Sequence, residues 1–253
     1  MKSPFDITNR QALIMGGTSG LGREIALGFA RAGCNTIATG RRQAETDSVT
    51  SEIQNLGVQT FSCPCDATNL DSLNNLKSQI TSLDILIYAA GKTLKKPTEE
   101  ITPEEWADVQ NVNTAAALRT CQTFLLLLKQ SQSPRIITIA SLSSFAAFYQ
   151  VAAYSASKAA LLSLTQSLAV EWGKHGIRSN AIVPGVFVTD LNRKLLNGTA
   201  RGQELLTRTP LNRFGNAEEL VGAALFLASD AASFINGIAL PVDGGFLASG
   251  VNQ

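Results

Sequence analysis

Short apolar runs alternate with longer amphipathic stretches along the whole sequence. Each apolar run is too short for a helix, and several are rich in isoleucine and valine, a composition typical of buried parallel strands. The expected strands are Ala12–Met15, Thr36–Thr39, Gln59–Cys63, Ile85–Ala89, Arg135–Ala140, Ser179–Val183 and Ile238–Val242. The helical patterns between them cover Leu21–Ala32, Glu45–Leu56, Leu70–Thr81, Glu104–Gln130, Tyr154–His175 and Glu218–Ser229.

This alternation predicts an α/β fold class. Strands joined through helices form right-handed crossovers, so we expect a doubly wound parallel sheet of about seven strands with helices on both faces. The sequence has no long linker rich in proline or serine, no low-complexity tract and no internal repeat, so its 253 residues are expected to form a single domain. Ligands bind at the carboxyl ends of the strands in such sheets, and functional residues are expected there.

Charge and composition argue against several classes of partner. The 21 basic and 20 acidic residues give a net charge of +1, which offers no general attraction to nucleic acid or to an anionic membrane. The longest aliphatic run, Phe124–Leu128, is too short to cross a bilayer, and the first ten residues contain no secretory signal. Four scattered cysteines and one histidine, His175, indicate reduced thiols rather than a metal site. We therefore expect a cytoplasmic protein.

The first expected strand runs directly into a glycine-rich turn that precedes a helical pattern. Glycines at such a turn let backbone amides approach a ligand, and the helix N-terminus adds a partial positive charge that suits a pyrophosphate. The turn does not fit a nucleoside triphosphate loop, because Arg23 stands where that loop requires lysine. The expected dinucleotide contacts are Gly16, Thr18, Ser19, Gly20, Leu21 and Gly22.

The second expected strand ends at Gly40-Arg41-Arg42. Sheets that bind NAD usually carry a carboxylate near this place, which accepts hydrogen bonds from the ribose 2′-hydroxyl. Here two guanidinium groups stand instead, and arginine forms bidentate, charge-assisted bonds to phosphate. The pattern favours NADP over NAD, although a solvated basic turn at the start of the next helix would read the same way.

Tyr154 and Lys158 are four residues apart on an expected helix and so share one face, while Ser141 follows the strand Arg135–Ala140. A free tyrosine has a pKa of about 10 and is a poor acid–base catalyst at neutral pH. A nearby ammonium lowers that pKa, and a serine hydroxyl can stabilise charge on a substrate oxygen. Alone, a Tyr-x3-Lys pattern usually marks an exposed helix face, so its interpretation depends on the neighbouring motifs.

Taken in order, these motifs make the chain resemble the short-chain dehydrogenase/reductase family over nearly its whole length. Gly16-x3-Gly20-x-Gly22 is similar to the cofactor loop of that family, and Ser141, Tyr154 and Lys158 match its catalytic serine and Tyr-x3-Lys motif. Asn113 matches a helix asparagine that holds a water in a proton relay with the lysine. The other cofactor contacts that the resemblance implies are Asp66, which would meet the adenine, and Ala90, Gly91, Pro184, Gly185, Val188 and Thr189.

The resemblance also implies an activity. It indicates a Rossmann-type domain over residues 1–253, with a cofactor part at about 10–140 and a catalytic and substrate part at about 141–253. NADP(H) would exchange a hydride with a ketone or a secondary alcohol, while Tyr154 gives or takes the proton. Lys158 would lower the tyrosine pKa and bind the nicotinamide ribose, and Ser141 would orient the carbonyl. A non-catalytic NADP-binding sensor on the same fold is the alternative.

The nearest relatives implied are 3-oxoacyl-carrier-protein reductases and gluconate 5-dehydrogenase-like sugar dehydrogenases, so the substrate is expected to be a 3-oxoacyl thioester or a sugar acid. The expected substrate loop, Val186–Phe214, mixes apolar residues with cations that suit a negatively charged substrate, although a solvated lid would look the same. The loop cations are Arg193, Lys194, Arg201 and Arg208, and the expected pocket walls are Phe145, Phe148, Tyr149 and Gln150.

Two further points complete the comparison with the family. Met15 replaces the threonine that opens the glycine motif, and Tyr88-Ala89-Ala90-Gly91 replaces the Asn-Asn-Ala-Gly segment, whose second asparagine braces the central sheet. The helices Glu104–Gln130 and Tyr154–His175 carry alanine and leucine around much of their circumference, which favours burial on two sides. A homotetramer is therefore expected, as is usual in the family.

Overall fold

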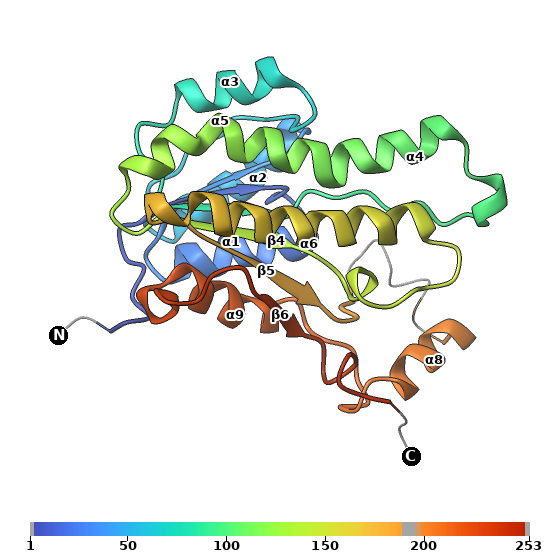
Figure 1. Ribbon diagram of the computed structural model, residues 1–253. Coiled ribbons are helices and arrows are strands. Elements are labelled where there is room, and N and C mark those ends of the chain that lie inside the picture. The colour runs from blue at the N-terminus through green and yellow to red at the C-terminus, as the bar shows by residue number, and fades with distance from the viewer. Residues whose placement is uncertain (1–2, 189–195, 197, 251–253) are drawn as a thin grey trace.

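The computed structural model of the protein describes residues 3–188, 196 and 198–250. Within these residues, six parallel strands form one sheet in the order β2-β1-β3-β4-β5-β6, with helices on both faces (Figure 1). The doubly wound parallel sheet expected from the sequence is confirmed, with one strand fewer. The strands are β1 (Gln11–Met15), β2 (Asn35–Thr39), β3 (Ile85–Tyr88), β4 (Arg135–Ile139), β5 (Arg178–Pro184) and β6 (Ala239–Val242).

The helices form two layers around the sheet. One layer contains α1 (Gly20–Arg31), α2 (Gln43–Asn55) and α9 (Glu219–Ala228), and the other contains α3 (Leu70–Ser78), α5 (Ala116–Gln130) and α6 (Ala152–Trp172). α4 (Pro103–Gln110) leads into α5, and α8 (Ala200–Thr207) follows β5. In the described part of the chain, no helix combines the length and the apolar character that crossing a bilayer requires.

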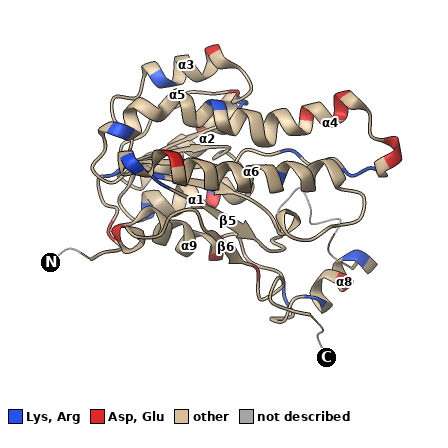
Figure 2. Ribbon diagram, in the orientation of Figure 1, with Lys and Arg blue, Asp and Glu red and all other residues tan. Residues whose placement is uncertain are grey.

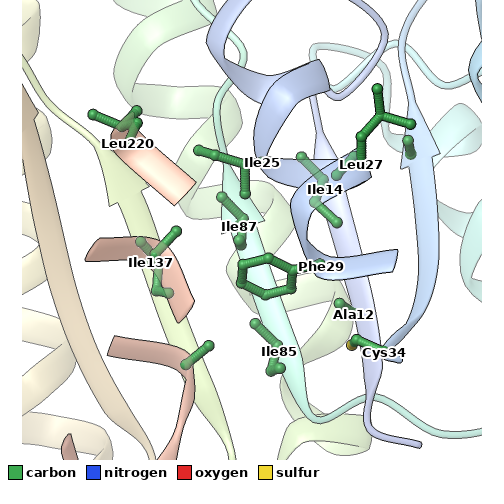
Figure 3. Packing of buried hydrophobic residues seen from close by; sticks show 14 of the residues in the cluster. Ala12, Ile14, Ile25, Leu27, Phe29, Cys34, Ile85, Ile87, Ile137 and Leu220 are labelled. Carbon is green, nitrogen blue, oxygen red and sulfur yellow. The ribbon is translucent and has the colours of Figure 1, made fainter. Parts of the chain in front are cut away.

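Two of the hydrophobic clusters, one on each face of the sheet, explain why the strand sequences are continuously apolar. Ile14 and Ile87 point to one face of the sheet, where Phe29 of α1 packs against them (Figure 3). Their neighbour Leu13 points to the other face and packs in a cluster that includes Phe124 of α5. Because both faces of each central strand are buried, every position favours an apolar residue.

The expected third strand, at residues 59–63, is wrong. The segment runs beside β2, and the Thr36 N–H donates to the Gln59 carbonyl (3.1 Å). The other polar groups at its two ends bond to β2 side chains: the Gln59 N–H donates to Asn35 Oδ1 (3.0 Å), and the Cys63 carbonyl accepts from Thr39 Oγ1 (2.6 Å). Side-chain partners take the place of the backbone ladder, so an extended segment forms without a strand.

The expected helix Glu104–Gln130 is one helical run with a change of winding inside it. α4 begins with a capping box, in which Thr102 Oγ1 accepts from the Glu105 N–H and the Glu105 side chain accepts from the Thr102 N–H. The π-helix η2 (Asn111–Ala115) then separates α4 from α5. Single π turns are frequent at functional sites, and this one contains Asn113.

Candidate active site

The glycine loop lies where the sheet order reverses. β2 and β3 flank β1 on opposite sides, so the loops after β1 and β3 diverge and leave a crevice at the carboxyl ends of the strands. Gly16, with φ of +80°, follows β1, and a Cβ there would lie 2.5 Å from the Ala90 nitrogen. A Cβ on Gly22 would lie 2.1 Å from the Gly16 carbonyl oxygen. Both positions therefore require glycine.

The start of α1 has the features of an anion-binding helix end. Ser19 is its N-cap, yet in the described structure the serine side chain makes no capping hydrogen bond and the first turn contains no acidic residue. The first amides of α1 thus have no side-chain acceptor of their own, and the helix dipole adds positive charge to them. This arrangement fits a pyrophosphate.

One cavity of about 790 Å³ joins this loop to the expected catalytic residues. It begins at the carboxyl ends of β1 and β2 and reaches the start of α6. Of the residues that the sequence assigns to the site, its lining contains Gly16, Thr18, Ser19, Gly20, Leu21, Gly22, Arg41, Arg42, Asp66, Ala90, Gly91, Ser141, Tyr154, Lys158, Pro184 and Gly185. The structure therefore brings together nearly all of the sequence-predicted positions.

Several predicted positions lie elsewhere. Val188 is not part of the lining and donates its N–H to the Gly215 carbonyl (3.4 Å), while Thr189 lies outside the described residues. Of the four expected wall residues, Phe148 lines the cavity and Phe145, Tyr149 and Gln150 do not. The side chains of Phe145 and Tyr149 are 55% and 80% exposed, because they lie on the outer side of the segment between Ser141 and α6.

The two arginines after β2 differ in their partners. Arg42 is the N-cap of α2 and forms an ion pair with Glu45. Arg41 is exposed, lines the cavity and has no ion pair within the described part of the chain. Asp66 also lines the cavity, and its Oδ1 accepts from the N–H and the hydroxyl of Thr68 (2.9 and 2.7 Å). Arg41 is thus the guanidinium that is free to bind an additional phosphate.

Ser141 is held by a neighbour that the sequence argument missed. It follows β4 as the N-cap of η3 (Leu142–Ser144), and its Oγ lies 2.8 Å from the Ser143 Oγ and accepts from the Ser143 N–H (3.2 Å). Both serines line the cavity, so two hydroxyl groups are available beside Tyr154. The two-residue spacing within Ser-x-Ser was a signal that could have indicated the second hydroxyl.

Tyr154 and Lys158 are adjacent, but their electrostatics differ from the expectation. The Lys158 Nζ lies 5.7 Å from the centre of the Tyr154 ring and donates to the Ile139 carbonyl (2.7 Å). Burial lowers the pKa of Lys158 to about 8. Burial also raises the pKa of Tyr154, and a hydrogen bond with Ser141 only partly offsets this rise. The lowered tyrosine pKa predicted from the sequence is wrong for this structure, because desolvation of the phenolate dominates.

Asn113 is fully buried and hydrogen-bonded to protein groups. Its Oδ1 accepts from the Lys92 N–H (2.7 Å), and its Nδ2 donates to the Lys92 carbonyl (2.9 Å) and to Ser157 Oγ (2.8 Å). The Ser157 hydroxyl in turn donates to the Tyr154 carbonyl (2.7 Å). The π turn therefore ties the segment after β3 to the first turn of α6, next to Gly91 and Lys158.

Tyr88 makes a brace of its own at the position where the family has the first asparagine. Its side chain is completely buried, and its hydroxyl donates to the Val112 carbonyl (2.6 Å), one residue before Asn113. Burial raises the pKa of this phenol, so the hydroxyl keeps its proton as a donor. Next to Tyr88, the Ala89 N–H donates to the Met15 carbonyl (2.8 Å). The two positions at which the chain departs from the family pattern, Met15 and Ala89, are therefore hydrogen-bonded to each other.

A Tyr88→Phe substitution is expected to lower the free energy of unfolding by about 1–3 kcal/mol, because it leaves the Val112 carbonyl buried without its donor. We also expect kcat to fall, since the π turn that carries Asn113 loses its link to β3. Thermal unfolding and steady-state kinetics would measure both effects. Tyr149→Phe, at an exposed tyrosine, is the matched control and should change neither quantity. Unchanged stability in Tyr88→Phe would contradict the bracing role.

Charges are dispersed over the molecule (Figure 2). Basic and acidic residues are interspersed on the helices, in keeping with the net charge of +1. In the ranges that the structure describes, no group of three or more histidine, cysteine, aspartate or glutamate side chains could hold a metal ion. The cavity itself offers the side chains of Ser141, Tyr154 and Lys158.

Comparison with known proteins agrees with this geometry. The family model described as enoyl-(acyl carrier protein) reductase matches residues 16–247. A gluconate 5-dehydrogenase from Gluconobacter oxydans is 34% identical over 249 residues, which cover 97% of each chain. Among solved structures, a protein from Beutenbergia cavernae assigned as an NAD(P)-dependent gluconate 5-dehydrogenase, with bound NADP at low occupancy, has a TM-score of 0.92 and 39% identity, covering 98% of this chain and 100% of that one.

A second solved structure extends the comparison. It is a gluconate 5-dehydrogenase from Burkholderia cenocepacia in complex with NADP and tartrate, with a TM-score of 0.92, 31% identity and 98% coverage of each chain. The matches span almost the full length of the chain and include the glycine loop and the tyrosine–lysine pair. The chain therefore belongs to the short-chain dehydrogenase/reductase family of oxidoreductases.

Proposed function

We propose that the protein uses NADP(H) to interconvert a hydroxyl group and a keto group of a sugar acid. The observation that carries the proposal is the single cavity that joins the glycine loop and Arg41 to Ser141, Tyr154 and Lys158. The similarity of the chain to gluconate 5-dehydrogenases supports a sugar acid, rather than a 3-oxoacyl thioester, as the substrate. The presence of the full serine–tyrosine–lysine set in one cavity supports an enzyme over a non-catalytic sensor.

The residues around the cavity fit a dinucleotide phosphate. The pyrophosphate would lie against the amides from Thr18 to Gly22, and the 2′-phosphate against Arg41. The remaining contacts that we propose are Gly16, Arg42, Asp66, Ala90, Gly91, Pro184 and Gly185. A contact of Thr189, which lies outside the described residues, stays a prediction. When bound, NADP(H) supplies or accepts the hydride, and the protein provides orientation and electrostatics.

The proton is moved by Tyr154 in this proposal. Its raised pKa keeps the phenol protonated at neutral pH, so the hydroxyl is ready to donate to a substrate carbonyl oxygen. Ser141, supported by Ser143, would hold that oxygen and stabilise its developing charge. Lys158 would bind ribose hydroxyls of the cofactor and adds positive charge beside the phenol.

Asn113 would act as a positioning residue. Both amide hydrogens and the amide oxygen of its side chain already have protein partners. In the water-mediated relay implied by the family resemblance, neither amide hydrogen of this side chain would be available to the water. Its side chain instead fixes Lys92 and the start of α6 relative to each other.

The proposal is tested by following NADPH absorbance with a panel of keto acids derived from sugars, β-keto esters and uncharged ketones. We expect turnover with a keto sugar acid such as 5-ketogluconate, and low rates with β-keto esters. Repeating the panel with NADH should give a higher KM for the cofactor. Preference for a β-keto ester would contradict the substrate class, and equal rates with NADH would contradict the cofactor.

Arg41→Gln should raise the KM for NADPH by about 10-fold, because a charge-assisted bond to the 2′-phosphate is lost from an exposed position. The KM for NADH should stay the same, since NADH lacks that phosphate. Arg42→Gln is the matched comparison and should have a smaller effect, because Arg42 is already paired with Glu45. Equal effects of Arg41→Gln on the two cofactors would show that Arg41 does not contact the 2′-phosphate.

The assembly, the location and the internal division of the chain stay proposals. A homotetramer is supported by apolar side chains left at the surface of the long helices, such as Leu126 on α5 (62% exposed) and Val170 on α6 (84% exposed). A mass in solution near four times 26.8 kDa would agree with it, and a monomeric mass would not. Four buried, free cysteines support a reducing location such as the cytoplasm. The cofactor part at about 10–140 and the catalytic part at about 141–253 likewise stay predictions.

A further inference from the structure

The cavity extends beyond Tyr154 to the helix α8, which contributes Arg201 and Leu205 to its lining. This is the end of the cavity where Ser141 and Tyr154 would meet the substrate. We propose that Arg201 binds the carboxylate of the sugar-acid substrate and so selects acids over uncharged polyols. The proposal deepens the function proposed above and rests on it.

The packing of α8 fixes which of its faces meets the cavity. Arg201, Leu205 and Arg208 are four and three residues apart and therefore share one face of the helix. Leu205 packs in the cluster formed by Leu142, Phe148 and Phe246, among others. The Arg208 guanidinium lies 5.1 Å from the centre of the Phe246 ring, which stacks on Phe148 at 5.8 Å.

The start of α8 is fixed as well. Thr199 is its N-cap and accepts from the Gly202 N–H (3.0 Å). A Cβ on Gly202 would lie 1.8 Å from the Leu196 carbonyl oxygen, so this turn packs tightly against the preceding residues and requires glycine. Arg201 is consequently carried on a backbone that is held at both ends. Arg201 lines the cavity one helical turn before Leu205.

The other charged groups of the cavity lining differ from Arg201. Lys92 pairs with Asp108, Arg42 pairs with Glu45, and Lys158 donates to the Ile139 carbonyl. Arg41 has no ion pair, but it follows β2 and stands beside the glycine loop, at the opposite end of the cavity from α8. Arg201 makes neither an ion pair nor a hydrogen bond within the residues that the structure describes. Among the described lining residues, Arg201 is therefore the cation near α8 that has no protein partner.

The stability of the helix does not explain this arginine. Arg201 lies in the first turn of α8, where the helix dipole disfavours a positive charge. A bound carboxylate would relieve that repulsion and accept two parallel hydrogen bonds from the guanidinium. Apolar side chains of Phe148, Val151 and Phe187 line the same cavity, and apolar surroundings reduce screening by water and so strengthen such a pair.

The test compares two substrates that differ only in the carboxylate. Gluconate and glucitol have the same carbon chain, but glucitol carries a hydroxymethyl group in place of the acid. With NADP⁺, Arg201→Gln should lower kcat/KM for gluconate by about 10- to 100-fold, mainly through KM, because a charge-assisted bond is lost. The low rate with glucitol should be unchanged. Arg201→Lys should recover part of the loss, since it keeps the charge without the bidentate geometry.

Two controls separate this role from a general effect. Lys95→Gln removes one exposed positive charge that does not line the cavity, and it should leave both substrates unaffected. Binding of NADPH, measured by fluorescence, should be the same in Arg201→Gln and in the wild type. An equal loss with gluconate and glucitol, or no loss with gluconate, would overturn the role of Arg201. Wild-type preference for glucitol would instead overturn the sugar-acid function, and the role of Arg201 with it.

Discussion

Replacing Tyr154 with phenylalanine is expected to lower kcat by about 10²–10⁴-fold, the usual contribution of a positioned proton donor. Phenylalanine keeps the ring that packs at the start of α6 and removes only the hydroxyl. The bonds between Ser141 and Ser143 should stay. The fold and the glycine loop should be unaffected, so the affinity for NADPH should stay near that of the wild type.

Stopped-flow or steady-state absorbance at saturating NADPH would measure the loss, and fluorescence titration would measure cofactor binding. Tyr149→Phe is the matched control, because it makes the same chemical change five residues earlier at an exposed side chain. It should retain full activity. Near-normal turnover in Tyr154→Phe would refute the proton-donor assignment. Loss of NADPH binding would show that the substitution disturbs more than the proton transfer.

Gly22→Ala is expected to abolish measurable binding of NADPH. The added Cβ would lie 2.1 Å from the Gly16 carbonyl oxygen, a backbone atom that cannot move without displacing the loop between β1 and α1. Overpacking of this kind usually costs about 1–3 kcal/mol of stability. Since the same loop presents the amides from Thr18 to Gly22, its displacement would remove the pyrophosphate site together with the stability.

Gly222→Ala provides the control within another helix. Gly222 lies in α9, and a Cβ there would meet no atom within 4 Å. Alanine is the better helix former, so this variant should be more stable than the wild type by about 0.5–1 kcal/mol and should bind NADPH normally. Thermal unfolding and cofactor titration of the two variants together would measure the contrast. Equal stability and equal NADPH binding in the two variants would contradict the close approach of the Gly16 carbonyl oxygen to Gly22.

The sequence predicted most of the fold because the signals involved are local. Buried parallel strands require apolar residues on both faces, so Ile85–Tyr88 and its neighbours could be identified from composition alone. The segment 59–63 was also expected to form a strand, yet it does not. Apart from one backbone bond to Thr36, the groups at its two ends bond to the side chains of Asn35 and Thr39. Those partners are distant in sequence, and no local pattern shows them.

In the site too, features that depend on local sequence could be predicted, and features that depend on contacts between distant parts of the chain could not. Ser141 and Tyr154 line one cavity as expected, because Ser141 follows the carboxyl end of β4 and Tyr154 lies in the first turn of α6, the next long helix. The direction of the Tyr154 pKa shift was not predictable, since it depends on burial by segments from several parts of the chain. The pairing of Arg42 with Glu45 and the approach of α8 to the cavity likewise depend on three-dimensional packing.

Because of the π turn at Asn111–Ala115, the structure depends on the number of residues in this stretch as well as on which residues they are. A π turn holds one residue more than a regular helix would. Deleting that residue would rotate α4 by about 100° around the helix axis relative to α5 and shift it by about 1.5 Å along the axis. Asp108 would turn away from Lys92, and the Val112 carbonyl would turn away from Tyr88. Insertions and deletions between Thr102 and Asn113 should therefore be rarer among active relatives than substitutions at the exposed positions of α4.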